Sequence, residues 1–140
     1  MVNVEDIMER NVLTIPRGTS LTDAARALAD RDVSGAPVCD ARGRLLGMVS
    51  KTDLIEAFAS KDGQLVEDVM YPEVLSVAPH VPIQAAVHLM AFEGVHRLMV
   101  LDEARTIVGI VTSMDLLRSL AGMPRRSVAR RMNAGGVEVL

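Results

Sequence analysis

The sequence contains very few aromatic residues and a single cysteine. Tyrosine occurs once, phenylalanine twice and tryptophan not at all, so a core must be built from Val, Leu, Ile, Ala and the nine Met residues. The lone cysteine, Cys39, excludes an internal disulfide. Because it follows the apolar residues Ala36-Pro-Val and nothing nearby would activate its thiol, we interpret it as a small buried hydrophobe.

Long hydrophobic runs and catalytic motifs are also missing. No stretch approaches the roughly 18 apolar residues of a membrane helix, and no basic start is followed by an apolar segment, which predicts a cytoplasmic protein without membrane contact. There is no HExxH, CxxC, Walker phosphate loop or GxSxG motif. No base stands beside a nucleophile and no metal cluster is evident, so we expect a protein that is not an enzyme, with no catalytic residue, no metal and no required cofactor.

Acidic residues outnumber basic ones over most of the chain. The net charge is −3, but residues 1–120 carry 17 Asp and Glu against 11 Lys and Arg, whereas residues 121–140 carry one against four. A body of this charge repels nucleic acid. The basic tail at 121–140 has four arginines but no aromatic platform or recognition motif, so nucleic acid is not an expected partner. We interpret this tail as a solvated or dimer-contacting segment.

The chain contains two copies of one sequence motif. Val4-Glu-Asp-Ile-Met8 matches Val66-Glu-Asp-Val-Met70 at an offset of 62, and this offset holds without a gap over residues 4–58, with 15 identities in 55 positions. A repeat of this kind decides the architecture before any local pattern does. A copy of about 55 residues is marginal alone, so we expect the two sheets to pack about a pseudo-twofold axis and share one core, with function in the clefts between them.

Within each copy, the apolar periodicity predicts the order strand, helix, strand, strand, helix. The runs at 12–15 and 74–77 are typical of strands. Apolar residues then recur at helical spacing, with Ser20 as an N-cap of the first helix and Pro82 as a first-turn proline of the second. The remaining expected elements are strands at 36–39, 45–49, 98–101 and 107–111, final helices at 54–58 and 116–120, and helical turns at 4–8 and 65–70.

Each copy ends its last strand with the same polar motif. The copies have Gly47-Met-Val-Ser-Lys-Thr-Asp-Leu54 and Gly109-Ile-Val-Thr-Ser-Met-Asp-Leu116. A hydroxyl at a helix start lies beside free N–H groups that favour phosphate, and a carboxylate three residues later can accept both hydroxyls of a ribose. The alternative is a capping box, in which both side chains satisfy N–H groups of their own helix. Recurrence in both copies fits an inherited binding cleft better.

Each copy has the predicted order β-α-β-β-α. It opens with Val-Glu-Asp-Ile/Val-Met and closes with Gly-h-Val-Ser/Thr-x-x-Asp-Leu, where h is a hydrophobic residue and x a variable one. The two copies resemble CBS motifs, named after cystathionine β-synthase. The resemblance covers residues 4–120, with motif 1 at 4–58 and motif 2 at 66–120. It implies an α/β fold in which tandem CBS motifs form one module at 1–120, ahead of the 121–140 tail. It also implies that the module binds AMP, ADP, ATP or S-adenosylmethionine in two clefts and often dimerises.

The resemblance also assigns roles to particular side chains. Asp53 and Asp115 would hold ribose. Ser50 and Thr112 would face phosphate together with the basic pair His96-Arg97, and a structural role for His96 is an equal alternative. The adenine cleft would consist of Thr14, Ala36, Pro37, Val38, Ser76, Leu98 and Met99.

Two departures from the family pattern make the clefts unequal. Many relatives place Arg or Lys immediately before the motif Asp, where this chain has Thr52 and Met114. Copy 1 also has Ser34-Gly35 where copy 2 has His96-Arg97. Fewer fixed cations disfavour tight ATP binding and favour a monophosphate or a mostly adenosine-driven ligand.

The sequence therefore predicts a regulatory module that senses an adenosine-containing small molecule. A module without an effector domain must act through an unknown regulated protein or through its own oligomer. The mean hydropathy of +0.26 and two leucine-bearing final helices favour a homodimer. The alternative function is a structural or protein-interaction module whose Ser/Thr-x-x-Asp segments serve only as caps.

Overall fold

The computed structural model describes residues 2–61, 63–123 and 138–139, and contacts divide the chain into two compact halves. We call residues 13–74 with 138–139 the first half, and residues 2–12 with 75–123 the second half. The four arginines of the predicted basic tail fall within 124–137 and lie outside the described residues.

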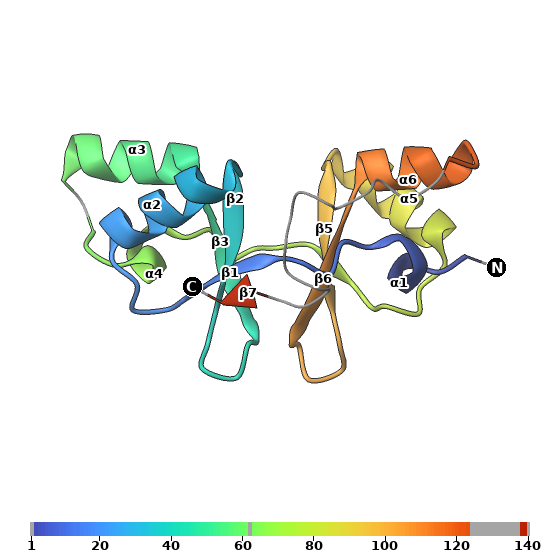
Figure 1. The fold of residues 1–140 in the computed structure, drawn as a ribbon, viewed down its shortest axis with the longest axis horizontal. Coiled ribbons are helices and arrows are strands. Elements are labelled where there is room, and N and C mark those ends of the chain that lie inside the picture. Colours follow the sequence, from blue (N-terminus) through green and yellow to red (C-terminus); the bar gives the residue numbers. More distant parts are fainter. Residues whose placement is uncertain (1, 62, 124–137, 140) are drawn as a thin grey trace. The chain divides into compact units, whose positions relative to one another are not determined.

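In the first half, helices cover one face of a small sheet (Figure 1). Its elements are β1 (Leu13–Pro16), α2 (Leu21–Arg31), β2 (Gly35–Cys39), β3 (Leu45–Ser50), α3 (Lys51–Ser60), α4 (Val66–Val69) and β7 (Glu138–Val139). The sheet order is β3-β2-β1-β7, with β1 parallel to both neighbours and β2 antiparallel to β3. The predicted N-cap is confirmed, because Ser20 Oγ accepts a hydrogen bond from the N–H of Asp23.

The second half repeats this plan around a sheet of order β4-β5-β6. Its elements are α1 (Val4–Ile7), β4 (Ser76–Val77), α5 (Ile83–Glu93), β5 (Arg97–Leu101), β6 (Ile107–Thr112) and α6 (Ser113–Leu120). The predicted mixed α/β class is confirmed, and so is the order of elements. Two details were wrong: β4 is shorter than the predicted run, and Pro82 is the N-cap of α5 instead of its first residue.

Each half has an apolar core of its own, where the sequence led us to expect one shared core, and the buried residues of both cores include no aromatic side chain. In the first half, Ile15, Val38 and Val49 from three strands meet Leu28 and Leu54 from the covering helices. The buried members of the second core are Val4, Met8, Ile83, Ala86, Met90, Leu98, Val100, Val111 and Leu116. Aliphatic and methionine side chains therefore fill both cores, as the composition predicts.

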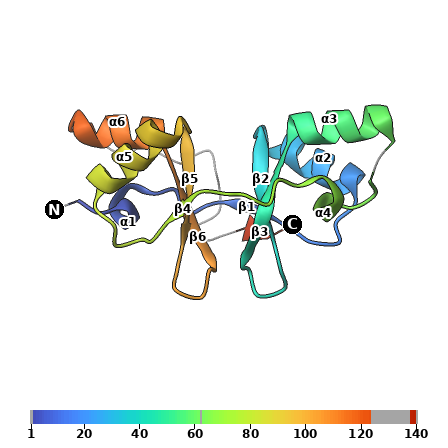
Figure 2. The same cartoon turned by 180° about the vertical axis from the view of Figure 1, so that it is seen from behind.

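The opening helix of each repeat packs in the half formed by the other repeat. Helix α1 contacts β6 and α6, and helix α4 contacts β3 and α3. Both views show α1 beside α5 and α6, and α4 beside α2 and α3 (Figure 1, Figure 2). The sequence repeats and the compact halves therefore have different boundaries.

Two motif glycines make room for these exchanged segments. A Cβ on Gly109 would lie 2.6 Å from Sδ of Met8, and a Cβ on Gly47 would lie 2.8 Å from Sδ of Met70. The second site is tighter, because the same Cβ would also lie 2.7 Å from the backbone oxygen of Tyr71. The glycine of the motif is thus required by close packing at these positions.

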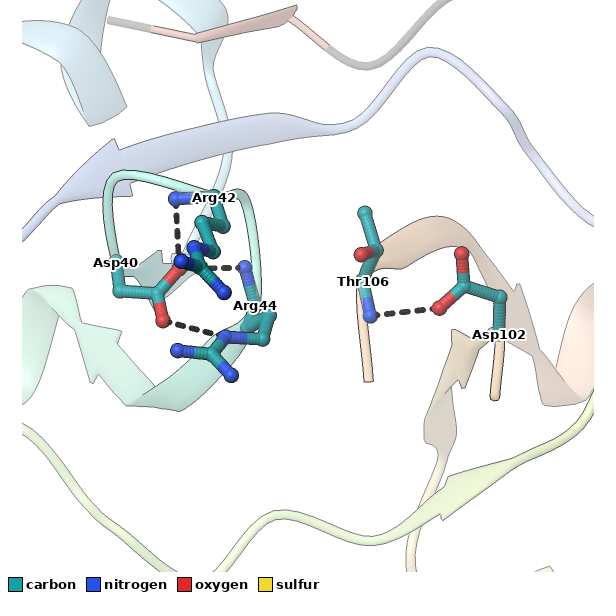
Figure 3. Close-up of polar contacts among 5 residues, drawn as sticks. All are labelled: Asp40, Arg42, Arg44, Asp102 and Thr106. Atoms are coloured by element: carbon teal, nitrogen blue, oxygen red, sulfur yellow. Dashed lines mark hydrogen bonds and ion pairs between the residues drawn. The ribbon is translucent and has the colours of Figure 1, made fainter. Parts of the chain in front are cut away.

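An aspartate fixes the turn of each sheet hairpin (Figure 3). Asp40 Oδ1 accepts hydrogen bonds from the backbone N–H groups of Arg42 (2.9 Å) and Arg44 (3.0 Å), and the guanidinium of Arg44 donates to Oδ2 at 2.8 Å. In the other hairpin, Asp102 Oδ1 accepts from the N–H of Thr106 at 2.9 Å. The predicted polar turns are therefore stabilised by side-chain carboxylates that replace missing backbone bonds.

Candidate functional site

The Ser/Thr-x-x-Asp segments form capping boxes in both halves. Asp53 Oδ2 accepts hydrogen bonds from the backbone N–H (2.9 Å) and the hydroxyl (2.8 Å) of Ser50, and the N–H of Asp53 donates to Ser50 Oγ at 3.2 Å. Thr112 and Asp115 form the same three bonds at 2.9, 2.9 and 3.2 Å. The capping interpretation of the motif is confirmed, and it stabilises the first turns of α3 and α6.

The helix starts are less open to an anion than the sequence suggests. In α3, the N–H of Asp53 is taken by Ser50, and the N–H of Lys51 donates to the backbone oxygen of Ser34 at 2.8 Å. In α6, the N–H of Ser113 donates to the oxygen of His96 at 2.9 Å. Two of the first three donors are therefore occupied in each helix, so fewer N–H groups are open to an anion at this position than the sequence led us to expect.

Several predicted site residues nevertheless meet at one end of each sheet. Gly35 is the antiparallel partner of Ser50, and Arg97 is the partner of Thr112. In the second half, β4 runs parallel to β5, and Ser76 at the start of β4 pairs with Met99, two residues after the start of β5. The start of β4 therefore lies at the same end of the sheet. Each half thus places a hydroxyl–carboxylate pair next to the start of its second strand.

The residues predicted for the adenine cleft divide between two faces of each sheet. Ala36, Val38 and Leu98 belong to the two apolar cores, so their side chains are occupied by packing and only their backbone groups remain for a ligand. Pro37 and Met99 alternate with them and therefore lie on the opposite face.

Thr14 also lies on the face of its sheet opposite the core, and its side chain is only 1% exposed. Its hydroxyl is hydrogen-bonded to the thiol of Cys39 on the neighbouring strand. Burial raises the pKa of this thiol, and the bond to Thr14 opposes the rise. Cys39 is thus buried, as predicted, but its hydrogen bond with Thr14 could not be predicted from the sequence.

The basic pair of the second half lies at the exposed edge of the site. His96 and Arg97 are both exposed, and Arg97 opens β5 directly opposite Thr112. His80 and His88 are exposed as well. The first half has Ser34 and Gly35 at the equivalent positions, so the two sites differ in charge, as the sequence predicts.

Within the first half, an open hollow of about 180 Å³ borders the motif carboxylate. Its lining comprises Asp53, Glu56, Ala57, Ser60 and Val69. Small-molecule sites usually occupy roughly 300–1,000 Å³, so this hollow alone does not enclose a nucleoside. Sequence reasoning missed Glu56 and Ser60, although their helical spacing from Asp53 would have placed all three on one side of α3.

A larger hollow of about 390 Å³ lies between α2 and α3, and none of the predicted site residues lines it. It is mostly apolar, and its lining includes Leu28, Leu54, Ile55 and Phe58, with Asp32 and Lys51 at the polar end. Across the described residues, no helix is long and apolar enough to cross a membrane. In the same part of the chain, no group of three or more His, Cys, Asp or Glu side chains lies close enough to hold a metal ion.

The chain belongs to the CBS domain family. The family model matches residues 4–60 and again residues 66–122, so the chain carries a pair of CBS domains. The matched segments include both hydroxyl–carboxylate pairs and both motif glycines.

Solved structures share this fold. The CBS domain pair of protein MJ0100, solved with 5′-methylthioadenosine and S-adenosyl-L-methionine, is 27% identical with a TM-score of 0.74, covering 87% of this chain and 98% of that chain. CBSX2 in complex with AMP is 28% identical with a TM-score of 0.76 and the same two coverages.

Among curated relatives, homoserine O-acetyltransferase of Methanohalobium evestigatum is 32% identical over 115 residues, which are 82% of this chain and 23% of that protein. The chain spans only 23% to 42% of the length of the first curated relatives it matches. The similarity therefore concerns their CBS portion.

Proposed function

We propose that this chain is a regulatory module that binds an adenosine-containing ligand through its two hydroxyl–carboxylate pairs, with no catalysis of its own. The observation that carries the proposal is the recurrence of the pair at the same end of both sheets. Two structural neighbours with 27% and 28% identity were solved with 5′-methylthioadenosine, S-adenosyl-L-methionine or AMP, which supports the choice of ligand class.

The capping boxes leave acceptor capacity for a ribose. A carboxylate offers about four acceptor positions, and the box of α3 uses two of them, both on Oδ2 of Asp53. Oδ1 takes no part in the box, and two ribose hydroxyls need two acceptors. Asp53 and Asp115 can therefore cap their helices and hold a sugar diol at the same time.

The proposed phosphate contacts differ between the two sites. In the second half, Arg97 and His96 lie beside Thr112 at the exposed edge, whereas the first half offers Ser50 without a basic pair. Because two helix N–H groups are already occupied at each site, the backbone supplies little further attraction for an extended phosphate chain. A monophosphate or an uncharged adenosine derivative fits this charge distribution better than ATP.

A nucleotide panel tests the proposal. The purified chain is heated with AMP, ADP, ATP, S-adenosylmethionine or 5′-methylthioadenosine, and at least one compound is expected to raise the melting temperature, since a ligand stabilises the state that binds it. Asp53→Ala or Asp115→Ala should weaken binding by roughly 10 to 100-fold, because a charge-assisted hydrogen bond contributes about 1.5–3 kcal/mol.

A matched variant separates lost binding from a lost cap. Ser20→Ala removes the N-cap of α2, which lies outside the proposed site, so it should lower stability and leave the ligand affinity unchanged. If Ser20→Ala weakened binding as much as Asp53→Ala, the weaker binding of both variants would result from lower stability and not from a lost ligand contact. No melting shift with any of these compounds at millimolar concentration would overturn the proposal.

The complete capping boxes support one alternative function. In that alternative, both motif aspartates serve α3 and α6 only, and the CBS pair is a scaffold for protein contacts or dimerisation. The nucleotide panel distinguishes the two functions, because a scaffold without a ligand gives no melting shift.

The sensor passes its signal to an unknown regulated protein or through a homodimer. Exposed apolar residues on the final helices support the second route. They are Ile55 and Phe58 on α3 and Met114, Leu117 and Leu120 on α6. The enzymatic activities of the longer curated relatives are not proposed for this chain.

A further inference from the structure

The N-terminal segment 2–9, here called the arm, is held by the second half at two places. The first place is the loop before α5. Three backbone hydrogen bonds join them there, from Val4 N–H to the Val81 oxygen (2.8 Å), from Glu5 N–H to the Pro79 oxygen (2.9 Å) and from Ile83 N–H to the Val2 oxygen (3.2 Å).

The second place is the edge of β6. Glu9 and Ile110 form an antiparallel bridge and exchange two backbone hydrogen bonds of 2.8 and 2.9 Å. Met8 is 1% exposed and lies on the surface that Gly109 leaves open, while Val4 is fully buried in the second core. The arm thus binds as an added edge segment with two side-chain anchors, as peptides bind to exposed sheet edges.

The first half holds an almost identical sequence in the same way. Met48 and Tyr71 exchange backbone hydrogen bonds of 2.8 and 2.6 Å, Val66 is fully buried, and Met70 lies on the surface left open by Gly47. Each half therefore has a groove that fits one sequence, Val-Glu-Asp-Ile/Val-Met. The local contacts are sufficient to hold this sequence, because both halves hold it in the same way although its flanking residues differ.

These contacts do not depend on which chain supplies the arm. The arm is joined to β1 through residues 10–12, and all its contacts described above are made within the second half, to the loop before α5, to β6, to α6 and to the core. An element whose contacts are the same within one chain or between two chains can be exchanged between copies at little cost. We propose that the groove on the second half, formed by residues 79–83 and the β6 edge at 109–110, also accepts the arm of another copy of this chain.

Single cysteines placed at the bridge test this exchange in the full chain. In a Cys39→Ala background, one preparation carries Glu9→Cys and a second, differently tagged preparation carries Ile110→Cys. Directly opposed residues of a hydrogen-bonded antiparallel pair have Cα atoms about 5.5 Å apart, which lies within the range of disulfides. Oxidation after mixing should give a heterodimer linked between positions 9 and 110, and brief warming before oxidation should raise its yield.

Two controls decide the result. The double variant Glu9→Cys/Ile110→Cys should form its disulfide within one chain, and failure to do so would overturn the placement of the arm. Pairing Glu9→Cys with Glu103→Cys, an exposed position in the β5–β6 hairpin, measures random cross-linking. A heterodimer yield for 9 with 110 that does not exceed this background would overturn the exchange.

Adding Gly109→Ala to the Ile110→Cys chain gives a second readout. The new Cβ would collide with Met8 of any incoming arm, so the yield should fall. An unchanged yield would overturn the proposed groove. Because the readout is one specific disulfide, a dimer formed through other surfaces does not mimic it, and ligand binding plays no part in it.

Discussion

At the scale of single residues, the motif aspartates have a structural role that is visible in every bond they make. Ser50 and Asp53, like Thr112 and Asp115, satisfy each other and the first turn of the following helix. Sequence alone could not separate this role from ligand binding, because both use the same residue types at the same spacing. The capping bonds from Ser50 and Thr112 fall on Oδ2 of each aspartate, so the cap does not exclude the proposed ligand contact through Oδ1.

The caps should be measurable in the free energy of unfolding. Ser50→Ala and Thr112→Ala should each lower it by about 1 kcal/mol, the usual contribution of an N-cap hydroxyl. Urea denaturation without ligand measures the change. Ser60→Ala, at the other end of α3, is the control, because its hydroxyl donates to the backbone oxygen of Glu56 and caps no helix start. Equal losses for Ser50→Ala and Ser60→Ala would contradict the assignment.

At the scale of elements, the apolar periodicity predicted the strands and helices of both halves in the right order. This succeeded because helices such as α2 and strands such as β3 each bury one side, and the period of the buried side follows from backbone geometry. The sequence could not show that α1 belongs to the second half and α4 to the first. Both helices have almost the same sequence, so either groove would have fitted the pattern.

The β2–β3 hairpin should be sensitive to acid. Hydrogen bonds from the backbone N–H of Arg44, its guanidinium and the N–H of Arg42 hold the pKa of Asp40 below its usual value. A carboxyl with a depressed pKa in the folded state stabilises the fold above its unfolded pKa of about 3.9 and loses this contribution as the pH falls through the folded pKa.

Comparison with Asp40→Asn measures this contribution. At neutral pH the wild type should be the more stable of the two, and the difference should shrink as the pH drops below about 4. Denaturant unfolding over a pH series gives the curve. A difference that stayed constant down to the lowest pH at which the protein folds would mean that the charge of Asp40 does not contribute.

At the scale of the whole molecule, exposed apolar side chains on the final helices predict self-association. Ile55 and Phe58 on α3 and Leu117 and Leu120 on α6 each expose between 49% and 66% of their surface, which is unusual for large apolar residues repeated along two helices. Sedimentation analysis should show a homodimer, and Phe58→Glu combined with Leu120→Glu should shift it towards monomer. Glu103→Gln, on an exposed hairpin, should not. A wild type that is monomeric at high concentration would refute this prediction.

The placement of α1 and α4 also decides where the chain can be divided. A fragment cut at the ends of the first repeat, 4–60, would carry Val4 and Met8 without the surface they cover, and Gly47 would lose Met70. A fragment spanning 13–74 keeps α4, the strands β1 to β3 and the contact of Gly47 with Met70 together, and it lacks only β7 of its sheet. A single repeat expressed alone would therefore present an opening helix and an empty groove that a second copy of the repeat could complete, the same exchange that the two repeats make within this chain.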